Sequence, residues 1–502
     1  MQSTPPLIQE GFKVLSTQYY LAIRLFSDVR FRAPILIIWV AFFGGALHDA
    51  VTTFYMLKLG ADEIAIGRIT AMKSVGGLFL SPLYGYWMDR NGVFFPLLIS
   101  SLCCSLGCLV RGLAQNLTQL YVGAAILGCG SGGLFTLVLS HISTHSPPCD
   151  RSAIVSAYLF QTNALLLLGK GLFPITNGIL VQLLGWNSDD LATYRVHMAT
   201  CTGFCFFGVA WLLKDGKELY VLSQQTAMAN VVERRKKKVE TKIGGANDST
   251  KDVKNIVKSS SVSDSNGNTG VIGTSKKVWW MFAILALVGA MQSAAYASMT
   301  VLWPFYVRDE FQFGSNQYSW FIFLAALVCT FTVASLPVVE KSIGKKMTAL
   351  ISTFIPSLGV IAFLPIWGSI ESTVGIGVGV AGHVLLTVLC LGFLRLGQAS
   401  VKSIAPLLVQ KKEQGKAFGL LATVVRGGEI VAGLVAPWLY KKSGGMMVPL
   451  LMVAGVLVVG SLLLVGLEDG VVGGSGSGEF TELDTMKDGE EDESSRPMLI
   501  KK

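Results

Sequence analysis

The chain has few charged residues: Asp, Glu, Lys and Arg together make up 15% of its 502 residues. An ordinary soluble domain carries roughly 25%, so this sequence lacks the charged surface that such a domain shows to water. It also lacks a polar composition, because apolar residues make up 51% and the mean hydropathy is +0.55. These shortages exclude a soluble enzyme and a disordered chain, while the 55 glycines fit membrane helices, which tolerate glycine.

A disulfide framework is missing too. Eight of the nine cysteines fall inside apolar stretches and only Cys149 lies in a loop, so we interpret them as small core residues. His141, His145 and Cys149 recur every four residues, but Pro147 and Pro148 would break a helix between them. We therefore expect no metal site. No phosphate-binding G-x-x-x-x-G-K-[ST] motif occurs, and nothing in the sequence requires a cofactor.

Long apolar runs are what the chain has in abundance. A membrane-spanning helix needs about 20 mostly apolar residues, and such runs occur twelve times, in two sets of six around a long polar interruption. We therefore predict an all-α membrane protein with twelve transmembrane helices in two six-helix bundles, 33–214 and 277–468. The predicted spans are 34–59, 65–88, 93–113, 117–140, 152–184, 194–214, 278–306, 317–339, 347–368, 374–398, 417–439 and 447–467.

Three polar segments flank the two bundles. Residues 1–32 form a mildly basic tail without a cleavable signal peptide. Residues 215–276 form a basic and disordered linker, and residues 469–502 an acidic tail. Lysine and arginine are more frequent in the connections on the side of these segments, which predicts that both termini are cytosolic. We assign the basic run 234–238 to contact with anionic membrane lipid and expect no nucleic-acid partner.

The connection between the second and third spans carries the most informative motif, G-Y-W-M-D-R-N-G at 85–92. A tight turn here needs the backbone freedom of Gly92, and a carboxylate such as Asp89 is stabilised at a helix N-terminus. Gly85, Asp89, Arg90 and Gly92 resemble the G-x-x-x-D-R-x-G-R-K loop of the major facilitator superfamily, although the trailing basic pair is absent.

The second half carries an echo of this motif at the same place. Glu340 and Gly344 stand between the eighth and ninth spans, and Arg151 precedes the fifth span, as in the short loop of the family. The resemblance covers 33–468. It implies two six-helix halves that rock about a central site, with a cytosolic gate built from Gly85, Asp89, Arg90, Gly92, Arg151, Glu340 and Gly344.

The fifth span contains a further family-like pattern. Gly169, Pro174 and Gly178 resemble the g-x-x-x-G-P-x-x-G-G motif of the drug-and-proton antiporter branch, with Phe173 and Asn177 in place of two glycines. The resemblance implies a bend in this span, close packing on the eighth span, and an efflux function.

Ionisable residues stand at membrane depth, where each costs about 2.5–3.5 kcal/mol on the insertion scale. Asp49 lies near the centre of the first span, and we predict that it faces water and accepts a proton. On the fifth span, Asn163, Lys170 and Asn177 are seven residues apart and share one helix face. We predict that Lys170 pairs with Asp49 or competes with it for a proton or the substrate; a static pair is the plainer interpretation.

The C-terminal half offers three more charged candidates. Arg426 and Glu429 are neighbours on the eleventh span. They form either an intrahelical pair or, through Glu429, a second proton site. Arg395 on the tenth span is a candidate cation for the cavity, and Gln292, Tyr296 and Trp303 on the seventh span could line a substrate path.

From these residues we expect a secondary transporter that moves a small organic solute by alternating access, with proton-coupled efflux as the first hypothesis. The first alternative is uptake or exchange of an organic anion, because Lys170, Arg395 and Arg426 outnumber Asp49 and Glu429. The second is a non-transporting receptor or chaperone on the same scaffold. No enzyme motif occurs. The expected partners are a small-molecule substrate, protons and membrane lipid; a monomer suffices, and the plasma and endolysosomal or vacuolar membranes both stay open.

Overall fold

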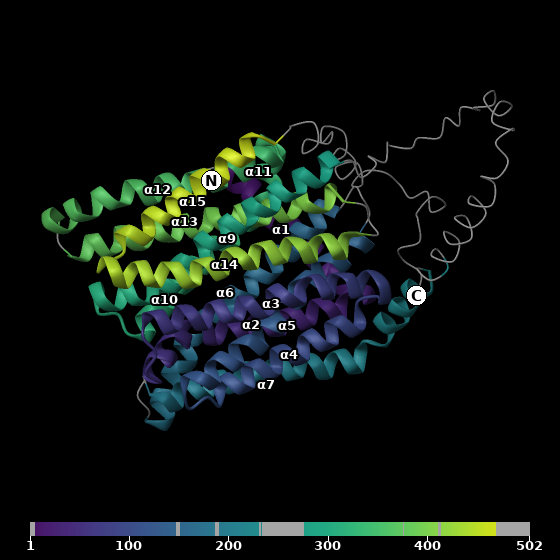
Figure 1. The fold of residues 1–502 in the computed structure, drawn as a ribbon, viewed down its shortest axis with the longest axis horizontal. Coiled ribbons are helices and arrows are strands. Elements are labelled where there is room, and N and C mark those ends of the chain that lie inside the picture. The colour runs from purple at the N-terminus through teal and green to yellow at the C-terminus, as the bar shows by residue number, and fades with distance from the viewer. Residues whose placement is uncertain are drawn as a thin grey trace, which may run out of the picture.

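The computed structural model describes residues 6–146, 151–185, 190–229, 232, 276–374, 376–409 and 413–467. Within these ranges every regular element is a helix (Figure 1). Most of the predicted linker and the whole acidic tail lie outside the described residues.

Twelve long helices form two bundles, as the sequence predicts, and eleven of them are long and apolar enough over the described residues to cross a membrane. In Figure 1 the purple-to-blue N-terminal helices lie mainly below the green-to-yellow C-terminal ones. The first bundle consists of α2 (Val29–Lys58), α3 (Glu63–Asn91), α4 (Phe94–Gly112), α5 (Leu117–His145), α6 (Arg151–Leu184) and α7 (Leu191–Asp215). The second consists of α9 (Lys276–Phe311), α10 (Ser315–Ala334), α12 (Lys345–Val374), α13 (Ile376–Ile404), α14 (Gln414–Ser443) and α15 (Met447–Val465).

The other elements in the described part of the chain are short or lie outside the bundles: α1 (Pro6–Ser27), a helix over 217–229, α11 (Leu336–Ile343) and a 3₁₀ turn (Ala405–Leu407). We call the end at which α2 begins and α15 ends the tail side, and the opposite end the loop side. The charge pattern predicts that the tail side faces the cytosol.

Two segments that we expected to be tail or linker are helical. The amphipathic α1 buries Leu25 in the core while Tyr19 and Tyr20 stay exposed. Residues 217–229 are helical, and the ring of Tyr220 lies 5.4 Å from that of Phe94. The prediction of a disordered linker was therefore wrong for 217–229, because this stretch has apolar residues that pack on the turn between α3 and α4.

The two halves end their corresponding helices in the same way. Gly92 follows α3 with a φ of 79° and donates its N–H to the Met88 carbonyl. Gly344 follows α11 with a φ of 83° and donates its N–H to the Glu340 carbonyl. Glycine adopts positive φ without the steric cost that other residues carry. The echo in the second half is thus a repeated backbone turn.

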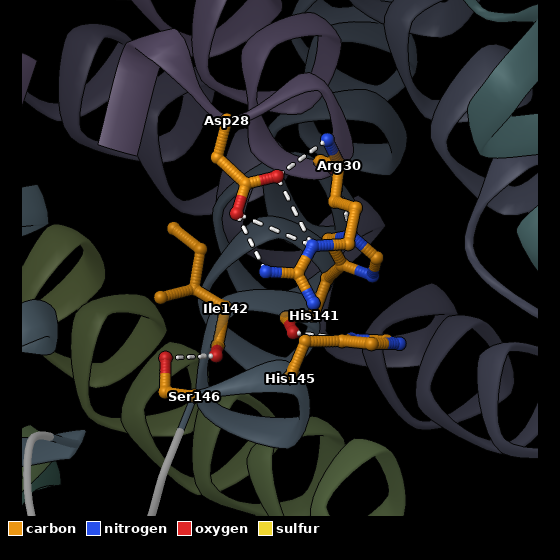
Figure 2. Close-up of polar contacts among 6 residues, drawn as sticks. All are labelled: Asp28, Arg30, His141, Ile142, His145 and Ser146. Atoms are coloured by element: carbon orange, nitrogen blue, oxygen red, sulfur yellow. Dashed lines mark hydrogen bonds and ion pairs between the residues drawn. The ribbon is translucent and has the colours of Figure 1, made fainter. Parts of the chain in front are cut away.

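A polar cluster ties the start of α2 to the end of α5 (Figure 2). Asp28 accepts hydrogen bonds from the backbone N–H and the guanidinium of Arg30, with Nη2 2.6 Å from Oδ2. Burial alone would raise the pKa of Asp28, but these hydrogen bonds lower it overall. Nε2 of His141 lies 3.1 Å from the Arg30 carbonyl oxygen, and Nδ1 of His145 2.9 Å from that of His141. Both histidines therefore bind backbone, and α5 ends at His145 before the two prolines.

The main apolar core is divided into two clusters, and both bundles contribute to each. The tail-side cluster includes Leu137 of α5 and Phe418 of α14. The loop-side cluster includes Phe173 of α6 and Tyr318 of α10. Since each cluster joins the two bundles, their interface is closed by apolar contacts towards both ends. Arg395, Arg426 and Glu429 lie between the two clusters along their helices, whereas Lys402 lies beside residues of the tail-side cluster.

Two helix pairs carry most of the contact between the bundles: α3 with α14, and α6 with α10. Along the first pair a Cβ atom on Gly67 would overlap the Gly433 carbonyl, and one on Gly85 would overlap that of Gly415. Along the second pair Thr330 of α10 donates its hydroxyl to the Asn163 carbonyl at 3.2 Å. The glycines let backbones approach closely, as is usual between membrane helices.

Candidate functional site

Glu429 on α14 points into the protein. The exposed apolar side chains of this helix share one side, and at 3.6 residues per turn Glu429 lies on the opposite one. Its side chain is nevertheless 24% exposed, and that of Arg426 is 20% exposed. The space that these two groups border is therefore inside the molecule, between the bundles. The exposed apolar side chains are Leu420, Val424, Val431, Leu434 and Trp438.

The Arg426–Glu429 pair forms as the spacing predicts and has a third member. Nη1 of Arg426 lies 2.7 Å from Oε2 of Glu429. Ser74 of α3 donates its hydroxyl to the same Oε2 at 2.8 Å. Lys73, which we did not single out for the site, is close enough to act electrostatically on Glu429. The pair thus connects the bundles and is more than an intrahelical contact.

Arg395 and Lys402 share one face of α13, two turns apart, and rest on aromatic rings. The guanidinium carbon of Arg395 lies 4.0 Å from the ring centroid of Tyr296, and its Nη1 donates to Oε1 of Gln398 at 3.1 Å. Nζ of Lys402 lies 4.6 Å from the ring centroid of Phe135, across the bundle interface. Among the described residues neither cation forms an ion pair with a carboxylate. Arg395 and Lys402 each have an electrostatic interaction with the carboxylate of Glu429.

The three polar residues of α6 lie opposite its exposed apolar side. Leu168, Leu172, Ile175 and Ile179 form that side, and the seven-residue spacing puts Asn163, Lys170 and Asn177 half a turn away from it. The charge of Lys170 acts on Cys329 of α10, as does that of Arg395. Asn177 is 1% exposed, and its side-chain oxygen has no hydrogen-bond partner in the described part of the chain.

Asp49 is an exposed carboxylate on a helix that is otherwise well covered. The side chain of Asp49 is exposed, and Val29 is the only large apolar residue in the described part of α2 with more than about a third of its surface exposed. That Asp49 faces interior water stays a prediction. Its charge acts on Tyr318 of α10, whose ring lies 5.7 Å from that of Phe54. The contacts described for Asp49 and Lys170 are to different residues of α10, and their pairing stays a prediction.

On the tail side, Asp89 joins the two bundles, and its predicted gating role stays a prediction. Its two carboxylate oxygens accept the backbone N–H groups of Gly415 and Lys416 at 3.0 and 2.8 Å, at the N-terminus of α14. A helix N-terminus favours a negative charge because its N–H groups lack partners within the helix. The guanidinium carbon of Arg90 lies 4.8 Å from the ring centroid of Tyr86.

The corresponding residue of the second half is more deeply enclosed. Glu340 is 8% exposed and accepts hydrogen bonds from Ser403 at 2.6 Å and from Ser400 at 3.4 Å, both near the tail-side end of α13. Arg151 begins α6, and its side chain lies outside the described residues. The gating roles predicted for Glu340 and Arg151 stay predictions.

The loop side is closed by ion pairs that we did not expect. Nζ of Lys441 lies 2.8 Å from Oδ2 of Asp62, and Nη2 of Arg308 lies 3.5 Å from Oε1 of Glu63. Both contacts join the start of α3 to the C-terminal bundle. Hydrogen bonds from Lys441 and from the Ala65 backbone lower the pKa of Asp62. The sequence did not predict these two ion pairs, because each partner, taken alone, is an ordinary charge at a helix end.

The family-like segment of α6 remains one helix through Pro174. A Cβ atom on Gly169 would meet Ala46 and the Phe43 carbonyl of α2, and one on Gly178 would meet nothing within 4 Å. Gly169 thus packs on α2 and not on α10, and the implied packing is made instead by Gly171, which faces Phe323 of α10.

Two six-helix bundles around charged residues at mid-depth define a membrane carrier built from two repeats. Residues 35–398 match the Major Facilitator Superfamily, and the chain belongs to this family. It is 27% identical over 153 residues to the MFS-type transporter phomT of Diaporthe leptostromiformis, which covers 30% of this chain and 22% of that one. The chain spans less than a third of the length of the curated relatives that it matches.

Two solved structures have the same fold. The human organic anion transporter MFSD10 (TETRAN) matches with a TM-score of 0.56 at 14% identity, over 88% of this chain and 99% of that one. The proton:xylose symporter XylE matches with a TM-score of 0.57 at 13% identity, over 90% and 95%. The family and its relatives point to a transporter and not to an enzyme. The drug-and-proton antiporter branch is not distinguished by these matches.

Proposed function

We propose that the protein carries a small organic anion across its membrane by alternating access. The observation that supports this most directly is the support of Arg395 and Lys402 by aromatic rings. A cation on the face of an aromatic ring is stabilised without being neutralised. The positive charge therefore stays available to a ligand, which a carboxylate partner would have prevented.

The balance of charge in the interior layer supports the same proposal. The charges of Lys170 and Arg395 both act on Cys329, and Arg395 also acts on Lys402. Lys73 acts on Glu429, which is bound by Arg426 and Ser74. An excess of buried positive charge is costly in a low-dielectric interior. A bound anion would offset that cost, and release of the anion at either face would restore it.

Flux into proteoliposomes tests the proposal with three labelled probes: succinate, tetraethylammonium and a neutral polyol. We expect exchange of the anion alone and a loss of at least about 10-fold in Lys402→Ala, since one charge contact to a ligand contributes about 1.5–3 kcal/mol. Lys442→Ala is the matched control, because Nζ of Lys442 also lies over a ring, that of Trp438 at 4.9 Å, but at the loop-side end. Transport of the cation and not of anions would overturn the proposal.

Proton coupling is the second candidate, and the position of Asp49 favours it. An exposed carboxylate that faces the interface from α2 can take up a proton from either side in turn. If this is its role, Asp49→Asn abolishes the dependence of flux on a pH gradient while exchange at equal pH persists. Unchanged gradient-driven flux in that variant would remove Asp49 from the coupling mechanism. Absence of flux for every solute would favour a receptor or chaperone.

A further inference from the structure

Three cysteines of the N-terminal bundle meet inside the protein. Cys108 belongs to α4, and Cys201 and Cys205 lie one turn apart on α7. Their sulfur atoms all lie within 4.8 Å of one another, and those of Cys108 and Cys201 are 3.7 Å apart. The three residues are 3%, 0% and 6% exposed.

The spacing of the sulfur atoms suits a single ion held between them. With metal–sulfur bonds of about 2.3 Å, three sulfurs around a trigonal ion stand about 4 Å apart. The closest pair stands 3.7 Å apart and all three sulfurs lie within 4.8 Å of one another, so an ion could bind with small side-chain adjustments. A disulfide would instead require the two closest sulfurs to approach to about 2.05 Å.

The donor set and its surroundings select the kind of ion. Thiol sulfurs are soft ligands that favour Cu(I), whereas structural Zn²⁺ takes four ligands in a tetrahedron. No fourth His, Cys, Asp or Glu belongs to the group among the described residues. The neighbours in the cluster are Cys104 and Leu127. Metal binding releases a proton from each sulfur that binds as a thiolate. In such apolar surroundings the loss of one proton to solvent makes the site neutral around a monovalent ion, and the other two sulfurs then bind as thiols.

We propose that Cys108, Cys201 and Cys205 form a three-sulfur site for Cu(I). The site joins α4 to α7, and α2 adjoins it, since a Cβ atom on Gly44 would lie 3.3 Å from the Cys201 carbonyl oxygen. A bound ion would fix three helices of the N-terminal bundle relative to one another. The point of contact on α2, Gly44, is five residues from Asp49. This proposal is independent of the substrate that the carrier moves.

Competition with bicinchoninate under anaerobic conditions tests the site on the reduced, purified full-length protein. We expect one Cu(I) per chain, an X-ray absorption spectrum with three sulfurs at about 2.3 Å, and displacement by Ag(I) but not by Zn²⁺. Cys108→Ala and Cys201→Ala are expected to weaken binding at least about 10-fold. Cys104→Ala is the matched control, because Cys104 is 5% exposed and belongs to the same cluster but not to the trio.

Several results would overturn the proposal. They are stoichiometric binding that survives in the triple alanine variant, equal loss in Cys104→Ala, and a spectrum with fewer than three sulfurs. Thermal unfolding of each variant without copper checks that it folds. The spectrum and the Ag(I) competition use the unaltered chain, so they decide the matter even if a variant fails to fold.

Discussion

Ser74 donates its hydroxyl to Glu429 across the interface of the two bundles, at 2.8 Å and 355 positions apart in the chain. The same Oε2 of Glu429 also accepts a hydrogen bond from the guanidinium of Arg426, which belongs to the same helix as Glu429. Separation of α3 from α14 would break the first bond and leave the second. The electrostatic surroundings of Glu429 therefore change whenever the bundles move, which is what a carrier needs to link occupancy to conformation.

Loss of the Glu429 charge is expected to destabilise the protein. In Glu429→Gln the guanidinium of Arg426 loses its carboxylate partner, which costs about 3–5 kcal/mol for a fully buried pair. Since both side chains are partly exposed, we expect about 1–3 kcal/mol, and about 1 kcal/mol for Ser74→Ala. Thermal unfolding in detergent measures both. The double variant Arg426→Gln with Glu429→Gln should recover part of the loss, and strictly additive losses would contradict the pairing.

Asp89→Asn is expected to loosen the tail side. The amide keeps the size of the side chain but removes the charge that the N-terminus of α14 binds, which contributes about 1–2 kcal/mol. This shifts the ratio of closed to open states by roughly 5- to 30-fold. Hydrogen–deuterium exchange at Gly415 and Lys416 reports the change directly, because their N–H groups are the donors.

The matched control for Asp89→Asn is Asp215→Asn. Asp215 is a tail-side carboxylate that lies 4.0 Å from Arg32 of its own bundle, so its loss should leave the exchange at the start of α14 unchanged. Equal acceleration in both variants would mean that negative charge in general, and not this contact, holds the tail side closed.

Alanine at two glycines of α3 should open opposite ends of the interface. A Cβ atom on Gly85 would overlap Gly415 on the tail side, and one on Gly67 would overlap Gly433 on the loop side. Overpacking of this kind costs about 1–3 kcal/mol. Spin-label distances across each end should lengthen at the tail side in Gly85→Ala and at the loop side in Gly67→Ala.

Gly455→Ala is the control for the two glycine variants, because a Cβ atom there meets nothing within 4 Å. It should leave both distances unchanged and stabilise α15 by up to about 1 kcal/mol through helix propensity. Lengthening at the same end in both α3 variants would contradict a two-ended closure along α3.

Local signals predicted the helices and the motif turns well. Apolar runs longer than about 20 residues have few alternatives to a membrane helix, so the twelve long helices followed from the sequence. The turns at Gly92 and Gly344 followed from a repeated pattern that requires positive φ. The contact between Arg426 and Glu429 followed from their spacing of three residues on one helix.

Contacts between distant segments had no comparable signal. Lys402 was overlooked because a lysine near a helix end is ordinarily an interfacial anchor, and its position over Phe135 depends on how the bundles meet. The three cysteines were predicted as core residues, since only the packing of α4 on α7 brings Cys108 to Cys201. The helix at 217–229 was missed because its apolar residues are too few for a membrane span, and their packing beside Phe94 depends on the fold.

The loop-side contact between Asp62 and Lys441 is expected to resist mild acid. Hydrogen bonds from Lys441 and from the Ala65 backbone lower the pKa of Asp62 below its usual value. A carboxylate with a lowered pKa stabilises the closed form above its ordinary pKa and loses that effect only as the pH falls through the lowered value. Nitroxide labels in place of Lys58 and Lys442 should therefore give the same distance distribution at about pH 7 and about pH 5, and a wider one only in stronger acid. Asp62→Asn should show the wider distribution already near neutral pH. The prediction is contradicted if the distance distribution differs between the two milder pH values and this difference is absent in Asp62→Asn. Asp62 would then take up a proton in that range despite its contact with Lys441.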